Sequence, residues 1–341
     1  MRSPRFVVAA LAVLAALGWH SLGRTGRPAA ALPSVAPPAA SGDRLIVEPD
    51  DGMAPIYALL SSPRRSLDLT MYELDDPTAE QILASDAGRG VRVRVILDRR
   101  LERVRNQPAY DYLSRRGAHV AWSSPRYFAT HEKAFVIDGR TAVIMSLNLT
   151  ARYYATSRDA AVVDVDRVDV AAIESVFTAD LRGQGAVPPA DDLVWSPGQS
   201  WADVLAMIGR ARSSVALESE ELTSPAVVSA LLAAARRGVQ VSVAMTYSDK
   251  WRPAFAALTR VGARIRVMYG ERPLYLHAKL IAVDAGRPGG MAFVGSENLS
   301  DASLLHDREL GLVLLAPRLV QRVAAVIGSD ESDGSAWPPP L

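Results

Sequence analysis

Two short segments of the chain pair a histidine with a lysine at the start of an apolar run that ends in aspartate. They read 131-HEKAFVID-138 and 277-HAKLIAVD-284. Residues two apart on a β-strand point to the same face, so the histidine and the lysine of each segment project together. An imidazole exchanges protons near neutral pH, and an ammonium group attracts anions. The pattern therefore indicates acid–base or nucleophilic chemistry on an anionic substrate.

The same polar residues follow both segments. A Ser-x-Asn triplet comes next, and a carboxylate lies eleven residues after the asparagine in each half. The first histidine precedes its asparagine by 17 residues and the second by 21. The extra residues fall within 285–290, whose composition is that of a turn, so a longer hairpin leaves the strand ends in place. The repeated set comprises His131, Lys133, Asp138, Ser146, Asn148 and Asp159 in the first half and His277, Lys279, Asp284, Ser296, Asn298 and Glu309 in the second.

If the two halves pack face to face, these side chains form one pocket with paired histidines, lysines and asparagines. The lysines and amides favour an oxyanion with several oxygens, such as a phosphate. One imidazole could attack phosphorus as a neutral nucleophile, while the other, protonated, gives its proton to the leaving oxygen. Asp159 and Glu309 could each hold one imidazole in the required tautomer. Because the lysines neutralise the charge, this chemistry calls for no metal and no cofactor.

An internal repeat positions these residues. Residues 66–100 align with residues 214–248 over 35 positions without a gap. Each block predicts an apolar strand, then a helix whose N-cap is Asp76 or Ser224 directly before a proline, then a β-branched strand. The alternation of strand and helix favours a mainly parallel sheet covered by helices. The repeat therefore predicts a duplicated α/β unit.

The predicted fold class is α/β, with two similar lobes related by pseudo-twofold symmetry. Each lobe is expected to be a mixed, largely parallel sheet flanked by helices. The first lobe is expected over residues 43–190 and the second over residues 191–330. We expect a Pro/Ala-rich linker over residues 27–42 and a disordered tail over residues 331–341.

Residues 1–26 are typical of a targeting segment. A basic start precedes the apolar stretch Phe6–Trp19, which is shorter than the ~20 residues that a spanning helix needs. This pattern predicts a signal peptide and export to a secreted or periplasmic location. An uncleaved N-terminal membrane anchor is the alternative.

Composition excludes several classes of protein. The chain has no cysteine, which rules out disulfides, cysteine metal sites and a thiol nucleophile. Lys and Arg number 38 against 37 Asp and Glu, so the net charge of +1 gives no global argument for nucleic acid binding.

His119 is interpreted as structural and His306 as a bystander. Three acidic residues near a strand end are interpreted as a solvated rim: Glu218, Glu220 and Glu221.

The motif His-x-Lys-x4-Asp, present twice and followed by Ser-x-Asn and an acidic residue, resembles the phospholipase D superfamily. The resemblance covers roughly residues 43–325. It implies two α/β lobes, an active site at their interface and a covalent phosphohistidine intermediate. The chain departs from the family pattern at Met145, where glycine is usual, and at Asp159, where glutamate is usual.

The resemblance implies a role for each repeated residue. His131 is expected to be the nucleophile and His277 the general acid. The phosphoryl oxygens would be bound by Lys133, Lys279, Asn148 and Asn298, with support from Ser146 and Ser296. Asp159 and Glu309 would orient the histidines, whereas Asp138 and Asp284 would be structural supports that tie down the turn after the strand.

These expectations favour a metal-independent phosphodiesterase that acts on phospholipids at a membrane surface, by hydrolysis or by transfer to an alcohol. A non-specific nuclease of the same superfamily is the alternative enzyme, with nucleic acid as its substrate. A non-catalytic module that binds phosphate-bearing surfaces is a second alternative. A nuclease should carry a continuous basic groove, and the sequence shows no strong one. We expect a monomer with no obligate protein partner.

Overall fold

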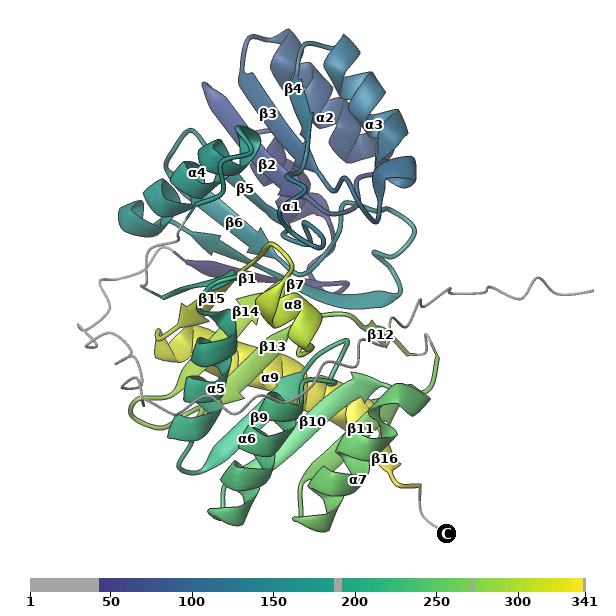
Figure 1. The fold of residues 1–341 in the computed structure, drawn as a ribbon, viewed down its shortest axis with the longest axis vertical. Coiled ribbons are helices and arrows are strands. Elements are labelled where there is room, and N and C mark those ends of the chain that lie inside the picture. The colour runs from purple at the N-terminus through teal and green to yellow at the C-terminus, as the bar shows by residue number, and fades with distance from the viewer. Residues whose placement is uncertain (1–42, 187–191, 271–272, 340–341) are drawn as a thin grey trace, which may run out of the picture. The chain divides into compact units, whose positions relative to one another are not determined.

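Two mixed sheets form the described part of the chain, one in each lobe (Figure 1). The computed structural model describes residues 43–186, 192–270 and 273–339. The predicted targeting segment and the whole of the predicted linker lie outside these residues. Below, residues 43–186 are the first lobe and residues 192–339 the second. Within these lobes, no helix has the length and apolar character needed to cross a membrane.

The first lobe alternates strands and helices until a final run of antiparallel strands. Its strands lie in the order β1-β7-β6-β5-β2-β3-β4. Its elements are β1 (Arg44–Glu48), α1 (Ala54–Leu60), β2 (Ser66–Met71), α2 (Pro77–Gly88), β3 (Arg92–Leu97), α3 (Arg103–Arg115), β4 (His119–Trp122), β5 (Ala134–Ile137), β6 (Thr141–Met145), β7 (Ser157–Asp164) and α4 (Arg167–Leu181).

The second lobe repeats this plan. Its strands lie in the order β8-β15-β14-β13-β9-β10-β11-β16, which matches the first lobe strand for strand and adds β16 at the edge. Its elements are β8 (Leu193–Ser196), α5 (Ser200–Arg210), β9 (Ser214–Glu218), α6 (Pro225–Arg236), β10 (Gln240–Thr246), η1 (Asp249–Trp251), α7 (Arg252–Arg260), β11 (Arg264–Met268), β12 (Tyr275–Leu276), β13 (Leu280–Val283), β14 (Met291–Gly295), α8 (Asp301–Leu305), β15 (Glu309–Leu314), α9 (Pro317–Asp333) and β16 (Ser335–Trp337).

The sheets are mixed, as predicted, but parallel pairing is less extensive than we expected. Between strands of the same lobe, it is confined to β2-β3-β4 and to β9-β10-β11. The strands that carry the polar motifs, β5 to β7 and β13 to β15, pair antiparallel. Parallel neighbours need a crossover such as α2, whereas β5 and β6 are joined by a tight turn that only an antiparallel pair accommodates.

Helix starts follow the sequence signals. Both α2 and α6 begin at the predicted prolines, Pro77 and Pro225. The Asp76 side chain accepts a hydrogen bond from the Thr78 amide at 2.9 Å, so it caps α2 as expected. Ser224 occupies the same position before α6 but makes no side-chain cap bond.

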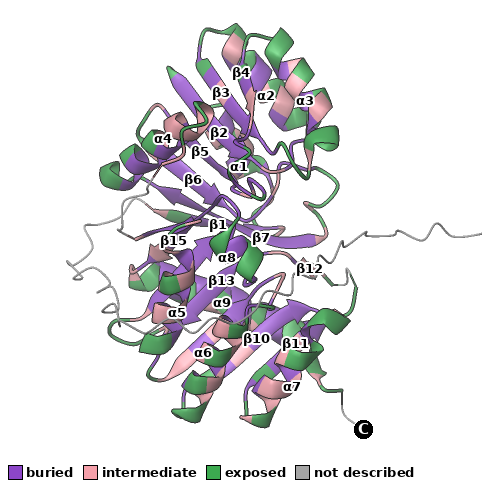
Figure 2. Ribbon diagram, in the orientation of Figure 1, coloured by how far each residue is buried: buried purple, intermediate pink, exposed green. Residues whose placement is uncertain are grey.

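A central core joins the two lobes. Apolar residues of β5 to β7 and α4 pack in the same cluster as residues of β13 to β15 and α9, with Ile144 and Val294 among its fully buried members. Separate outer cores lie under α1 to α3 and under α5 to α7. Figure 2 shows the resulting pattern: the strands are almost entirely buried, and exposed residues gather on the outward faces of the helices. The shared core fixes the lobes against each other through the hydrophobic effect.

The C-terminal residues differ from the disordered tail that we predicted from residue 331. Helix α9 continues to Asp333, and β16 pairs antiparallel with β11. The Trp337 ring packs edge-on against Phe255, with 5.5 Å between ring centroids. This aromatic contact supplies the apolar burial that the polar composition of the tail did not suggest.

Candidate active site

Short strand pairings between the lobes bring the two histidine motifs together. Thr130 forms a parallel bridge with Arg308, and β12 pairs in parallel with the start of β7. The His131 amide donates to the Arg308 carbonyl at 2.9 Å, and the His277 amide donates to the Arg158 carbonyl at 3.1 Å. Each histidine is therefore held at the lobe interface by the backbone of the opposite lobe.

Each imidazole is also oriented by a carboxylate of the opposite lobe. His131 Nδ1 lies 2.9 Å from Glu309 Oε2, and His277 Nδ1 lies 2.8 Å from Asp159 Oδ1. Both acids are buried. A carboxylate at Nδ1 fixes the proton of a neutral imidazole there and leaves the Nε2 lone pair free. Pairing of the acids with the histidines was predicted, but the exchange between lobes was not.

Burial sets the charge state of the first pair. Desolvation lowers the pKa of His131, although Glu309 opposes this effect. Burial acts to raise the pKa of Glu309, but the neighbouring His131 and Lys133 outweigh it, and the pKa of Glu309 is lowered. The pair therefore consists at neutral pH of an ionised carboxylate and a neutral imidazole, the form in which a histidine can act as a nucleophile.

The two lysines lie directly beneath the histidines. Lys133 and Lys279 are each about 1% exposed, and their ammonium groups donate to the carbonyls of His131 and His277 at 2.5 Å. Burial lowers the pKa of Lys133 to about 7. An arriving phosphoryl anion would favour the charged ammonium, so substrate binding and lysine protonation are coupled.

The serines and asparagines occupy different places around this pair. The Ser146 hydroxyl donates to Asp159 Oδ1 at 2.6 Å, whereas the Ser296 hydroxyl donates to the Leu310 carbonyl at 3.4 Å. Both serines are fully buried, and they contact the strands that carry Asp159 and Glu309. We had expected them beside the groups that bind the phosphoryl oxygens. Asn148 and Asn298 each have a buried Oδ1 that finds no partner among the described residues.

Asp138 and Asp284 lie at the far ends of their strands. Each has a positive φ, 54° and 50°, in the turn of a hairpin. Asp138 accepts from the amides of residues 64–66, and Asp284 accepts from the amides of residues 212–214. Each carboxylate thus fastens the turn to the beginning of the neighbouring strand, away from the histidines.

Met145 points away from the site. Its side chain is fully buried in the outer core of the first lobe. At the equivalent place in the second lobe, a Cβ on Gly295 would lie 2.6 Å from Gly311 Cα and 2.7 Å from the Phe293 ring. The first lobe has Val143 and Ala161 where the second has Phe293 and Gly311. The methionine therefore fills space that the phenylalanine fills in the other lobe.

Two buried arginines were missed by the sequence interpretation. Arg158 precedes Asp159 and forms a two-point ion pair with Asp330 of α9, at 2.8 and 2.9 Å. Arg308 precedes Glu309 and contacts Asp180 of α4 at 2.7 and 2.9 Å. Each pair crosses from one lobe to the other. The equal offsets of these residues in the internal repeat were the available signal. We call the two pairs the arginine clamps.

Two of the three acidic residues that we interpreted as a solvated rim, Glu218 and Glu220, have other surroundings. Glu218 is fully buried, and burial raises its pKa well above the usual value. Glu220 lies inside the site, where its Oε2 is 3.1 Å from Lys279 Nζ and 3.4 Å from His277 Nε2. In the first lobe the Tyr72 ring lies edge-on to His131, with 4.6 Å between centroids.

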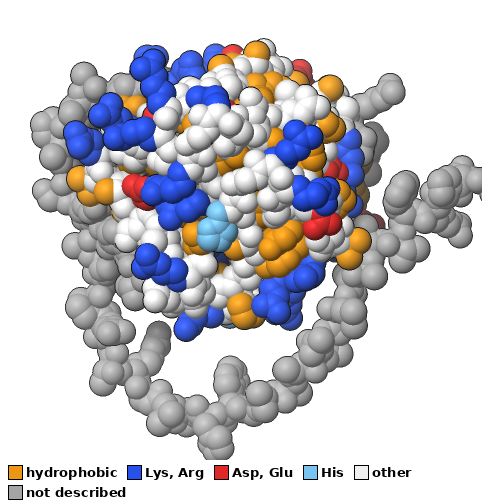
Figure 3. Space-filling view, turned by 90° about the horizontal axis from the view of Figure 1, so that it is seen from above, with side chains coloured by type: hydrophobic (Ala, Val, Ile, Leu, Met, Phe, Trp, Pro, Cys, Tyr) orange, Lys and Arg blue, Asp and Glu red, His pale blue; other side chains and the backbone are white. Residues whose placement is uncertain are grey.

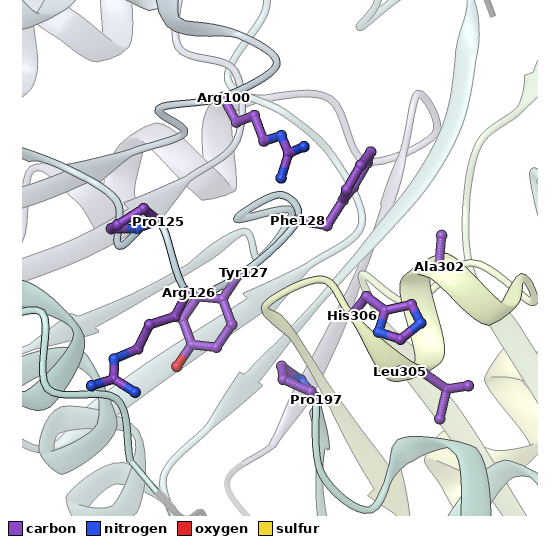
Figure 4. Close-up of a pocket in the computed structure, with 9 residues that line it drawn as sticks. All are labelled: Arg100, Pro125, Arg126, Tyr127, Phe128, Pro197, Ala302, Leu305 and His306. Atoms are coloured by element: carbon purple, nitrogen blue, oxygen red, sulfur yellow. The ribbon is translucent and has the colours of Figure 1, made fainter. Parts of the chain in front are cut away.

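A cavity of about 490 Å³ lies between residues 125–128 of the first lobe and Pro197 and α8 of the second, and its lining includes neither His131 nor His277 (Figure 4). Its lining combines apolar groups such as Phe128 and Leu305 with the guanidinium groups of Arg100 and Arg126. The Phe128 amide donates to the His306 carbonyl, two residues before the Thr130 bridge. The cavity therefore lies at the interface of the two lobes, as the histidine motifs do.

Basic side chains gather elsewhere on the first lobe. Figure 3 shows Lys and Arg over the end of this lobe that faces away from the second lobe, with few acidic groups between them. Arg65 and Arg92 lie beside Asp138, at the strand ends opposite to Lys133. This positive face is thus separated from the histidines by the length of the sheet.

A sequence profile described as "Cardiolipin synthase, PLD-like domain" matches residues 56–181 and 204–330. These matches cover more than half of the chain, one in each lobe. The protein therefore belongs to this family of phospholipase D-like domains, as its paired motifs predicted.

The chain is also similar in sequence to one relative and in fold to two solved structures. It is 28% identical over 137 residues to the mitochondrial cardiolipin hydrolase of Xenopus tropicalis, a stretch that covers 38% of this chain and 60% of that protein. The chain thus spans less than two thirds of this relative. Polyphosphate kinase from Porphyromonas gingivalis aligns over 86% of this chain and 48% of its own, with a TM-score of 0.70 and 15% identity. Phosphatidylserine synthase from Haemophilus influenzae aligns over 86% and 87%, with a TM-score of 0.65 and 12% identity. At these identities the structures establish the shared two-lobed fold alone.

Proposed function

We propose that the protein is a phosphodiesterase that acts on phospholipids through a covalent phosphohistidine, by hydrolysis or by transfer to an alcohol. The observation that carries this proposal is the crossed arrangement of the histidines. Each imidazole has its Nδ1 on a buried carboxylate of the opposite lobe, and a buried lysine lies beneath it. Two activated imidazoles around one anion site suit a double displacement at phosphorus.

In the first step His131 is the nucleophile. Its Nε2 lone pair forms a bond to phosphorus, and the bond between phosphorus and the leaving oxygen breaks. His277 gives its Nε2 proton to that oxygen, so the alcohol leaves neutral. Lys133 and Lys279 bind the phosphoryl oxygens and stabilise the charge that develops on them. Glu309 stabilises the His131 imidazole as it takes on positive charge.

The second step reverses the roles of acid and base. His277, now neutral, removes a proton from water or from an acceptor alcohol. The new oxygen bonds to phosphorus, the bond from phosphorus to His131 Nε2 breaks, and the starting enzyme returns. Water as acceptor gives hydrolysis, and an alcohol gives transfer. Asp159 stabilises His277 in both directions because it binds the Nδ1 proton throughout.

Phospholipid is the favoured substrate class. The family description and the name of the Xenopus relative both refer to cardiolipin. The cavity between the lobes has apolar as well as basic lining, which suits an amphiphilic phosphodiester. The basic face of the first lobe lies away from the histidines, which disfavours a continuous nucleic acid groove into the site. We further propose export or membrane anchoring, which would place the enzyme at a lipid surface.

A turnover assay on the full chain tests this function. Vesicles of phosphatidylcholine, phosphatidylglycerol or cardiolipin are compared with single-stranded DNA, in the presence of EDTA. We expect lipid turnover that His131→Ala abolishes. Mass spectrometry after an alkaline quench should find the added phosphatidyl or phosphoryl mass on the peptide that contains His131.

The matched control is His119→Ala, which removes an exposed histidine at the start of β4. This variant should keep wild-type activity. Cleavage of DNA without lipid turnover would instead identify a nuclease. Binding of lipid without turnover of either substrate would identify a non-catalytic module.

A further inference from the structure

The carboxylate of Glu220 accepts hydrogen bonds from Lys279 and Asn298, the donors of the second lobe that we expect to bind phosphoryl oxygens. Its Oε2 lies 3.1 Å from Lys279 Nζ, 3.3 Å from Asn298 Nδ2 and 3.4 Å from His277 Nε2. Its Oε1 accepts a hydrogen bond from the Tyr275 hydroxyl at 3.0 Å. The Glu220 side chain is 24% exposed to solvent. A carboxylate is itself an oxyanion, so Glu220 makes the contacts that a phosphoryl group would make.

The first lobe has no such anion at the equivalent place. The internal repeat aligns Glu220 with Tyr72, whose ring contacts His131 and lies 4.9 Å from Lys133 Nζ. The two half-sites thus share their histidine, lysine and asparagine but differ by one negative charge. Burial acts to raise the pKa of Glu220, but Lys279, His277 and His131 together lower it, so the carboxylate is ionised.

We propose that Glu220 determines which phosphodiesters the site accepts, by favouring substrates whose leaving group carries a positive charge. A phosphoryl anion cannot share Lys279 and Asn298 with a carboxylate, so substrate must displace Glu220 from them. The displaced carboxylate stays close to the phosphoryl group, because Glu220 follows β9 by only two residues. Two anions in a partly buried site repel each other, and a cation between them removes the repulsion.

The leaving group lies on the side of Glu220. This step rests on the proposed function, in which His277 protonates the leaving oxygen. Glu220 Oε2 lies 3.4 Å from His277 Nε2, the atom that would deliver the proton. An ammonium group on the leaving alcohol would therefore come within reach of Glu220, whereas an uncharged alcohol would leave the carboxylate unpaired.

Binding of two matched phosphate monoesters tests the proposal without any turnover. O-phosphoethanolamine carries an ammonium group, and ethyl phosphate has the same chain without it. Isothermal titration calorimetry on the full chain should show that the wild type binds O-phosphoethanolamine about tenfold more tightly, a preference of about 1.4 kcal/mol. Glu220→Gln should tighten ethyl phosphate about tenfold and remove the preference.

Two further variants keep the test specific. Glu221→Gln removes the same charge one position along and should leave the preference unchanged. Glu220→Tyr copies the first lobe and should bind ethyl phosphate as tightly as Glu220→Gln does. A thermal melt confirms that each variant is folded.

An unchanged preference in folded Glu220→Gln would overturn the proposal, as would binding of neither ligand by the wild type and this variant. Failure of lipid turnover would overturn the proposed function instead, since the binding constants do not depend on catalysis.

Discussion

The two histidines share a geometry but differ in their immediate surroundings. His131 contacts the Tyr72 ring, and burial lowers its pKa. His277 Nε2 lies beside the Glu220 carboxylate, which can accept a hydrogen bond from a protonated nitrogen. The two half-sites therefore differ in the group that faces each imidazole, an aromatic ring at His131 and a carboxylate at His277.

Removing either histidine should have different effects on different leaving groups. A p-nitrophenolate leaving group needs no proton, whereas an alkyl alcohol does. We expect His277→Ala to lower kcat on short-chain phosphatidylcholine by about 10²–10⁴-fold. On bis(p-nitrophenyl) phosphate the same variant should release one p-nitrophenol per enzyme in a burst, because the second step lacks its base. Stopped-flow absorbance measures the burst.

His131→Ala should lose both reactions, because it removes the nucleophile. A burst from His131→Ala and none from His277→Ala would mean that the two roles are exchanged.

At the scale of elements, the arginine clamps tie the segments that carry Asp159 and Glu309 to the opposite lobe. Arg158 lies at the beginning of β7 and binds α9, and Arg308 directly precedes β15 and binds α4. The residue after each arginine is the acid that orients a histidine. A strand that is fixed at this point holds its carboxylate at the distance that the imidazole requires.

Breaking one clamp should reduce stability and activity together. Asp330→Asn removes the two-point partner of the buried Arg158 guanidinium, which keeps the exposed Asp50 and the Glu48 carbonyl, and loss of a buried ion-pair partner costs about 3–5 kcal/mol. Urea denaturation measures the free energy of unfolding. We also expect a lower kcat, because Asp159 follows Arg158 directly.

Asp333→Asn is the matched control, since it removes an exposed carboxylate from the same helix. Equal stability of the two variants would show that the clamp does not hold the lobes together.

For the whole molecule, the described residues include many acids whose pKa burial raises to between about 6 and about 8. The pKa is raised to about 6 for Asp203, to about 7 for Glu48, Glu73, Glu80, Asp164 and Asp307, and to about 8 for Glu132 and Asp169. Between pH 4.5 and 7 these groups bind more protons in the folded state than in the unfolded state. The free energy of unfolding therefore falls as pH rises through this window. His131 and Lys133, whose pKa values are lowered, act in the opposite direction but are outnumbered.

Glu297 offers a single-residue test of this pH dependence. It is fully buried, both carboxyl oxygens lack a partner among the described residues, and burial raises its pKa well above 4.5. The first lobe has Leu147 at the equivalent position. We expect Glu297→Leu to have a larger free energy of unfolding than the wild type. This gain in stability should be larger at pH 8 than at pH 5, by about 1 kcal/mol or more.

Urea denaturation at the two pH values measures this difference. Leu147→Ile is the control and should shift both values equally. A stability gain of the same size at both pH values would contradict the prediction.

The local chemistry and the repeated unit could be predicted from the order of the residues alone. The spacing of histidine, lysine and asparagine depends on the period of a strand, so it predicted which side chains share a face. The ungapped repeat predicted the two lobes, because equal patterns of apolar residues form equal cores. Pairing directions were less predictable, since they depend on the length of each connection and on which edge receives it.

Only the tertiary structure decided how the two halves combine. It assigned Glu309 to His131 and Asp159 to His277, and it placed Glu220 beside Lys279. These contacts join residues that are 59 to 178 positions apart in the chain. Local periodicity carries no information over such separations. They arise when the shared central core packs two sheets together, and the geometry of that packing chooses each partner.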